Sequence, residues 1–121
     1  MAGVFRRLTK LLWLRKNDPE LFERAAYFMT TADFFTGWLC GNSVYDPTSA
    51  AITRLFDIRT GKYNDALISR IGIEKSKFSA VLPCGKRAGT LGVDAASALG
   101  LSPGIPVWIG AHDQYCAALG S

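Results

Sequence analysis

The chain has 121 residues, 49% of them hydrophobic and 20% charged, which is typical of one globular domain with a core and leaves no room for a second domain. Its formal net charge of +4 is unevenly placed, since five cations precede the first acid, Asp18: Arg6, Arg7, Lys10, Arg15 and Lys16. The other nine basic residues face ten acids, so the body of the chain is nearly neutral and nucleic-acid binding is not expected.

The cysteines give no sign of a disulfide framework. Cys40, Cys84 and Cys116 are odd in number and widely spaced, and His112 is the one histidine that could join them as a ligand. This pattern fits neither paired disulfides nor a zinc site, and it indicates a reducing, cytoplasmic compartment. No apolar stretch approaches the roughly 18 residues that span a bilayer, and the start of the chain has no uninterrupted signal-peptide core, so we expect a soluble protein.

Residues 5–16 are predicted to form an amphipathic helix. Leu8, Leu11, Leu12, Trp13 and Leu14 alternate with basic residues at helical spacing, which gives an apolar face flanked by cations. A surface helix packed on the core is the favoured interpretation. A membrane-surface helix and a transit peptide are the alternatives.

Two further helices are predicted before residue 42. Asp18 is expected to cap a helix with Pro19 at its first position, and the apolar residues that follow predict a buried side as far as Met29. A new helix is expected after residues 30–31, ending at Gly41. The carboxylates of Asp33 and, further on, Asp46 are interpreted as caps or turn formers and not as catalytic groups.

The middle of the chain is predicted to consist of short elements. Residues 42–48 are expected to be a loop, 50–56 a short strand or helix edge, 59–62 a turn around Gly61, and 63–71 a helix. Residues 75–86 are irregular, with an extended piece at 81–83, and 88–92 are predicted to be a compact turn. A short helix is expected at 94–99, ended by Gly100.

The end of the chain places an acid after an apolar run. Val107, Trp108 and Ile109 predict a buried strand, and residues 114–119 predict a small-residue helix that Gly120 ends. Asp113 therefore follows the carboxyl end of a strand, which is where ligands bind in open α/β folds. It is a candidate for chemistry and also for a helix N-cap to the amide of residue 115 or 116.

A series of short motifs runs through the chain in order: KLLWL at 10–14, DPE at 18–20, DFFTG at 33–37, residues 46–57, LP at 82–83, GTLG at 89–92, GLSPGIPV at 100–107 and GAHDQ at 110–114. The series resembles the middle of an FGGY-type carbohydrate kinase, a family that includes xylulokinase, gluconate kinase and glycerol kinase relatives. Cys84 and Tyr63 depart from the residues that the family pattern leads us to expect.

The resemblance implies a fold and a site. Residues 1–121 would be a single partial domain of α/β class, the C-terminal portion of a ribonuclease H-like (actin-like ATPase) N-terminal domain that ends at the catalytic segment. Asp113 would match the catalytic aspartate, which accepts the proton of the sugar hydroxyl that attacks the γ-phosphorus of ATP. Gln114 resembles a neighbouring position that hydrogen-bonds a substrate hydroxyl. His112 stands at a variable position, either as a substrate contact or as a histidine satisfied by local backbone.

The same resemblance implies that ATP and Mg²⁺ bind to elements that lie outside this chain. The chain would carry part of the sugar side of the cleft and none of the ATP side, and it would be inactive alone, with exposed apolar groups such as Trp108 that favour marginal stability or self-association. The sugar stays open among ketoses, polyols and sugar acids, with a xylulokinase-like substrate as the leading hypothesis. The alternatives are a non-enzymatic module whose basic N-terminus binds a membrane or a partner, and a degenerate remnant.

Overall fold

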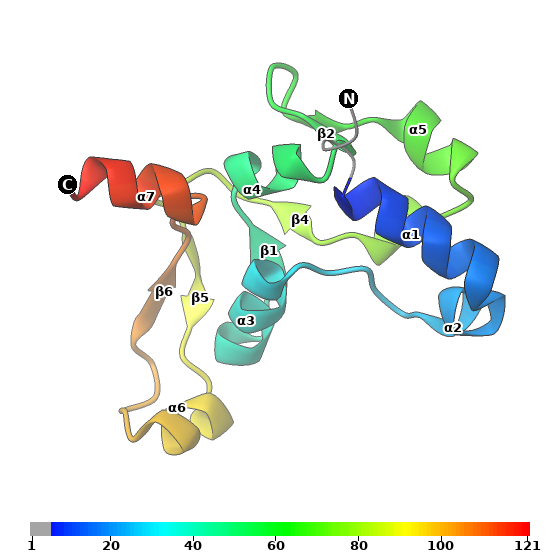
Figure 1. Ribbon diagram of the computed structural model, residues 1–121. Coiled ribbons are helices and arrows are strands. Elements are labelled where there is room, and N and C mark those ends of the chain that lie inside the picture. The colour runs from blue at the N-terminus through cyan, green and yellow to red at the C-terminus, as the bar shows by residue number, and fades with distance from the viewer. Residues whose placement is uncertain (1–5) are drawn as a thin grey trace.

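The computed structural model describes residues 6–121, which form short helices and strands (Figure 1). The helices are α1 (Arg6–Asn17), α2 (Pro19–Arg24), α3 (Thr31–Cys40), α4 (Pro47–Ile52), α5 (Asp65–Arg70), α6 (Val93–Leu99) and α7 (Asp113–Leu119), with a 3₁₀ turn at Lys75–Lys77. The strands are β1 (Val44–Tyr45), β2 (Phe56–Asp57), β3 (Lys62–Tyr63), β4 (Ala80–Val81), β5 (Arg87–Thr90) and β6 (Pro106–Trp108).

The predicted amphipathic helix is present as α1 and packs on the core. Leu8, Leu11 and Leu14 contact a buried cluster of Phe22, Leu55, Ile68, Ile71 and Ile73. The guanidinium of Arg15 donates a hydrogen bond to the carbonyl of Ile71 at 2.9 Å. The favoured interpretation of this segment is confirmed, and the expected first residue, Phe5, lies outside the described residues.

The helix expected from Pro19 to Met29 is much shorter than the sequence indicates. Asp18 caps α2 as predicted, accepting a hydrogen bond from the Leu21 amide at 3.0 Å, but the helix ends at Arg24. The amide of Phe28 donates instead to the carbonyl of Lys77 at 2.8 Å. A tertiary contact therefore replaces the helical bond that the local pattern favours.

Helix α3 begins and ends where predicted. Asp33 reaches back to Thr30, accepting hydrogen bonds from its amide at 2.6 Å and its hydroxyl at 2.5 Å. Gly41 takes a left-handed φ of 77° at the C-terminus, which a residue without a Cβ adopts at little cost. Asp33 is thus a capping group, as expected.

The strands form three separate pairs. β1 and β4 pair in parallel, β2 and β3 form an antiparallel hairpin whose turn has Gly61 at φ 66°, and β5 and β6 pair antiparallel. Two predictions are corrected here, because the expected loop at 42–48 contains β1 and the expected compact turn at 88–92 belongs largely to β5. The predicted helix at 63–71 begins only at Asp65, and Tyr63 lies in β3.

The β5–β6 pair lies between helices α6 and α7. Helix α6 lies at one end of the pair and α7 at the other (Figure 1). Helix α3 packs beside both strands, and at Gly89 in β5 an added Cβ would lie 3.0 Å from the Cβ of Cys40. The predicted buried strand is correct only in part, because Ile109 is buried whereas Trp108 keeps 61% of its surface exposed.

Candidate functional site

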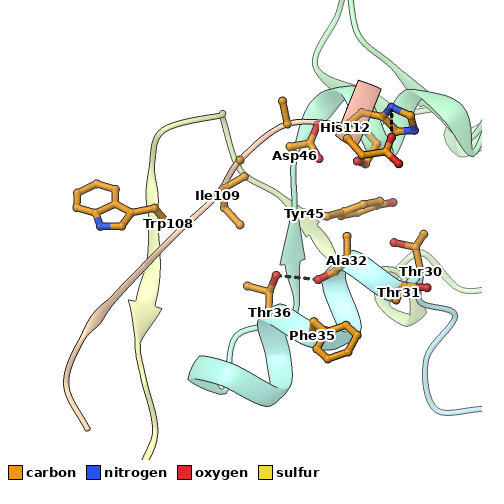
Figure 2. A pocket seen from close by; sticks show the side chains of 14 residues that line it. Thr30, Thr31, Ala32, Phe35, Thr36, Tyr45, Asp46, Trp108, Ile109 and His112 are labelled. Carbon is orange, nitrogen blue, oxygen red and sulfur yellow. Dashed lines mark hydrogen bonds and ion pairs between the residues drawn. The ribbon is translucent and has the colours of Figure 1, made fainter. Parts of the chain in front are cut away.

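A cavity of about 420 Å³ lies where the start of α3, the end of β1 and the segment before α7 meet (Figure 2). Figure 2 shows His112 and Asp46 on one side, Phe35 and Thr36 on the other, and Tyr45 between them, while the ring of Trp108 points away. The volume falls within the range of about 300–1,000 Å³ that is typical of small-molecule sites. The lining residues are Thr30, Thr31, Ala32, Phe35, Thr36, Tyr45, Asp46, Ser49, Trp108, Ile109, Gly110, Ala111, His112 and Asp113.

Asp113 lies at the rim of this cavity, as its position after a strand predicts. It is the first residue of α7, and its side chain is 87% exposed. The expected N-cap role is wrong, since His112 is the N-cap residue and Asp113 Oδ1 accepts from the amide of Gln114 at 2.7 Å. Nδ1 of His112 lies 2.9 Å from the same oxygen. Within residues 6–121 the other oxygen, Oδ2, accepts no hydrogen bond and is available to a ligand.

Of the two other predicted site residues, one lines the cavity and the other does not. His112 lines the cavity, its ring Nδ1 contacts Asp113, and its amide donates a hydrogen bond to the hydroxyl of Thr48 at 2.9 Å. Its side chain therefore contacts the candidate base rather than a backbone carbonyl. Gln114 is exposed and does not line the cavity, so its predicted role as a substrate contact stays a prediction.

Asp46 forms a buried anionic group in the cavity wall. It caps α4, as the sequence predicts, and its Oδ1 accepts hydrogen bonds from the amides of Thr48 and Ser49 at 2.8 and 2.9 Å and from the Thr48 hydroxyl. Burial alone would raise the pKa of Asp46, but the hydrogen bonds donated by Ser49 and Thr48 outweigh it and hold that pKa below its ordinary value. The carboxylate is therefore ionised at neutral pH.

A second polar network lies beneath Tyr45. The hydroxyls of Tyr45 and Tyr63 lie 2.8 Å apart, and the Tyr63 hydroxyl donates to the carbonyl of Ser79 at 2.7 Å. The Ser79 hydroxyl in turn donates to Asp33 Oδ2 at 2.5 Å. Burial, together with the hydrogen bond to Tyr45, raises the pKa of Tyr63, so its phenol stays neutral. The network joins α3 to β1, to β3 and to the residue before β4, and it fixes one wall of the cavity.

The sequence analysis missed most of the residues that line this cavity. The Asp46-Pro47 pair carried a usable signal, because aspartate before proline is typical of a helix start and α4 begins there. Thr30, Phe35 and Tyr45 carried none, since their approach to Asp113 depends on the tertiary fold. Among residues 6–121 no three histidine, cysteine, aspartate or glutamate side chains gather into a group that could hold a metal ion.

The helices of residues 6–121 are all too short or too polar to cross a bilayer.

Comparison with known proteins identifies relatives over nearly the whole chain. The model of the FGGY family of carbohydrate kinases, N-terminal domain, matches residues 2–120. L-fuculokinase of Escherichia coli strain K12 is 33% identical over 120 residues, which cover 99% of this chain and 25% of that protein. Xylulose kinase of Staphylococcus xylosus is 29% identical over 114 residues, which cover 94% of this chain and 24% of that protein.

A solved structure gives the same result. The crystal structure of xylulose kinase from Rhodospirillum rubrum matches with a TM-score of 0.84 and 28% identity, covering 91% of this chain and 23% of that one. The chain thus spans about a quarter of the length of the curated relatives it matches.

Proposed function

Because the chain belongs to the FGGY family of carbohydrate kinases, we propose that it supplies the sugar-binding wall and the general base of an ATP-dependent kinase that phosphorylates a sugar hydroxyl. Its α/β fold is part of the N-terminal domain of these actin-like ATPase-fold enzymes. The observation that carries the proposal is the exposed carboxylate of Asp113, which lines a cavity that is large enough for a monosaccharide.

The proposed chemistry of Asp113 is proton acceptance. As the sugar hydroxyl oxygen bonds to the γ-phosphorus of ATP, the bond from phosphorus to the leaving ADP breaks and the hydroxyl proton passes to Oδ2. Phosphoryl transfer has a loose transition state, so the base mainly orients the hydroxyl and takes its proton late. The hydrogen bond from the Gln114 amide to Oδ1 and the 2.9 Å contact of His112 Nδ1 with the same oxygen hold the carboxylate in one orientation and leave Oδ2 for this step.

Mg²⁺ would neutralise phosphate charge in such a reaction. Within residues 6–121 no three potential ligands gather into a metal site, and we assign the metal no position on this chain. We propose that binding of Mg–ATP depends on polypeptide beyond residues 1–121 and that the isolated chain does not phosphorylate sugars.

The proposed substrate class is a ketose. Two of the relatives are named for L-fuculose and xylulose, which are both ketoses. The cavity suits such a ligand, because the hydroxyls of Thr30, Thr31 and Ser49 can bond sugar hydroxyls and the ring of Phe35 offers an apolar surface to the sugar's C–H groups. Polyols and sugar acids stay as alternative substrates.

The rival proposal of a membrane- or partner-binding N-terminus has less support. The leucines that would insert into a membrane already contact Phe22, Leu55 and their neighbours in the core. Trp13 and Leu12 are the large apolar side chains of α1 that stay exposed, at 62% and 45%. No observation favours this module over the kinase.

The test is a kinase assay. The reading frame that encodes this chain is expressed together with any coding sequence that flanks it in the source genome, and the protein obtained is called the complete product. Xylulose, L-fuculose, a polyol and an aldonate are supplied with Mg–ATP, and the 121-residue chain is assayed in parallel. We expect phosphorylation of a ketose by the complete product and none by the 121-residue chain. Turnover of no sugar by the complete product would contradict the proposed function and favour a degenerate remnant.

A further inference from the structure

Thr48 joins the two segments on which the site depends. Its hydroxyl donates to Oδ1 of Asp46 and accepts from the amide of His112, with 2.9 Å between the amide nitrogen and the hydroxyl oxygen. Asp46 and Thr48 belong to the N-terminus of α4, whereas His112 lies 64 residues further along and immediately precedes Asp113. In the strand pairs of residues 6–121 the two segments are not partners, so this contact ties them directly.

The direction of this link follows from the charges. An ionised carboxylate has no proton to give, so the single proton of the Thr48 hydroxyl is donated to Asp46. The hydroxyl's lone pairs then face the remaining donor, the amide of His112. Asp46 itself cannot turn, because the amides of Thr48 and Ser49 also bind its Oδ1. The anion therefore sets the orientation of the hydroxyl, and the hydroxyl sets the position of the His112 amide.

Besides this link, the backbone hydrogen bonds of Ile109 with Gly85 and Lys86 hold the segment, but they lie four residues before the candidate base. The side chain of Asp113 is 87% exposed, and its bonds to Gln114 and His112 are made within its own segment. Neither bond fixes the segment relative to the cavity. A displacement of about 1 Å in a reacting group can lower a rate by about 100-fold, so an anchor one residue from the base has kinetic consequences.

We propose that Thr48 is a positioning residue, which holds Asp113 at the cavity rim by linking the buried Asp46 carboxylate to the backbone of His112. The inference rests on the proposed function, in which Asp113 is the general base. It adds a role for the Asp46-Pro47-Thr48 segment, for which the sequence predicts only a loop and a cap or turn former at Asp46.

The test compares Thr48→Val with Thr48→Ser in the complete product of the reading frame. Valine keeps the shape but can neither donate nor accept, whereas serine keeps the hydroxyl. Thr53→Val is the matched control. The Thr53 hydroxyl also bonds to backbone of α4, because it donates to the Ala50 carbonyl at 2.6 Å, but this hydroxyl has no bond to the Asp113 segment. We expect kcat to fall by roughly 10- to 100-fold in Thr48→Val with KM for ATP unchanged, and to stay within about threefold of wild type in Thr48→Ser and Thr53→Val.

A second readout is independent of catalysis. Hydrogen exchange of the His112 amide, measured at residue resolution, is expected to speed up in Thr48→Val and not in Thr53→Val. If no variant or wild-type protein phosphorylates a sugar, the proposed function fails while the exchange result still decides the link. Unchanged exchange in Thr48→Val, or an active kinase whose kcat is the same in Thr48→Val and Thr53→Val, would overturn the positioning role.

Discussion

Replacing Asp33 by alanine tests whether this buried carboxylate is structural. Asp33 is 1% exposed and accepts hydrogen bonds from the amide and hydroxyl of Thr30 and from the hydroxyl of Ser79. Losing the cap of α3 costs about 1 kcal/mol of unfolding free energy. Leaving the 5% exposed Ser79 without its acceptor adds roughly 1–3 kcal/mol, so we expect Asp33→Ala to lower the free energy of unfolding by about 2–4 kcal/mol.

Asp18→Ala is the matched control for this measurement. Asp18 also caps a helix, but it is exposed and accepts only the Leu21 amide, so its loss is expected to cost about 1 kcal/mol or less. In urea unfolding followed by circular dichroism, with a slope of about 1.5 kcal/mol per M, the midpoint should fall by roughly 1–2 M more in Asp33→Ala than in Asp18→Ala. If the alanine variant of Asp33 is unfolded without urea while that of Asp18 is folded, the conclusion is the same. Equal shifts in the two variants would refute the reasoning.

Two further predictions concern backbone and charge. Gly100 has φ 67° and open space around its Cβ position, so Gly100→Ala should lower the free energy of unfolding by about 1 kcal/mol. Gly110 has equally open space but no positive φ, so Gly110→Ala should not lower it. Equal urea midpoints for the two variants would contradict this prediction. Because the folded-state pKa of Asp46 lies below the ordinary pKa of an aspartate, its stabilising contribution is present above that ordinary pKa and lost as the pH falls through the folded-state pKa. The stability advantage of wild type over Asp46→Asn should therefore shrink below about pH 4, and an advantage that stays constant in urea unfolding down to pH 2 would exclude this account.

The features that the sequence predicted correctly are those that depend on neighbouring residues. Asp18 before Pro19 starts a helix, and Gly41, Gly61 and Gly100 each take the left-handed conformation that ends a helix or forms a turn. These signals are local, because a cap or a positive φ needs only the adjoining backbone. The position of Asp113 after a strand is predicted for the same reason.

The features that were missed depend on distant partners. β1 and β4 have two residues each and form by pairing Val44 with Ala80, so neither is long enough to show an alternating pattern. The helix expected as far as Met29 ends at Arg24, and Phe28 bonds to Lys77 instead. The link from Thr48 to His112 joins residues 64 apart and has no local signature. The proposed role of Asp113 as general base came from the family resemblance and not from the pattern around it.

The most direct test of the account is the activity of Asp113→Asn in the complete product of the reading frame. Asp94→Asn is its matched control, because Asp94 is also an exposed acid in the first turn of a seven-residue helix, α6, away from the cavity. The account predicts that kcat for ketose phosphorylation falls by roughly 10²- to 10⁴-fold in Asp113→Asn and stays at the wild-type value in Asp94→Asn. A kcat in Asp113→Asn within threefold of wild type would show that Asp113 is not the general base.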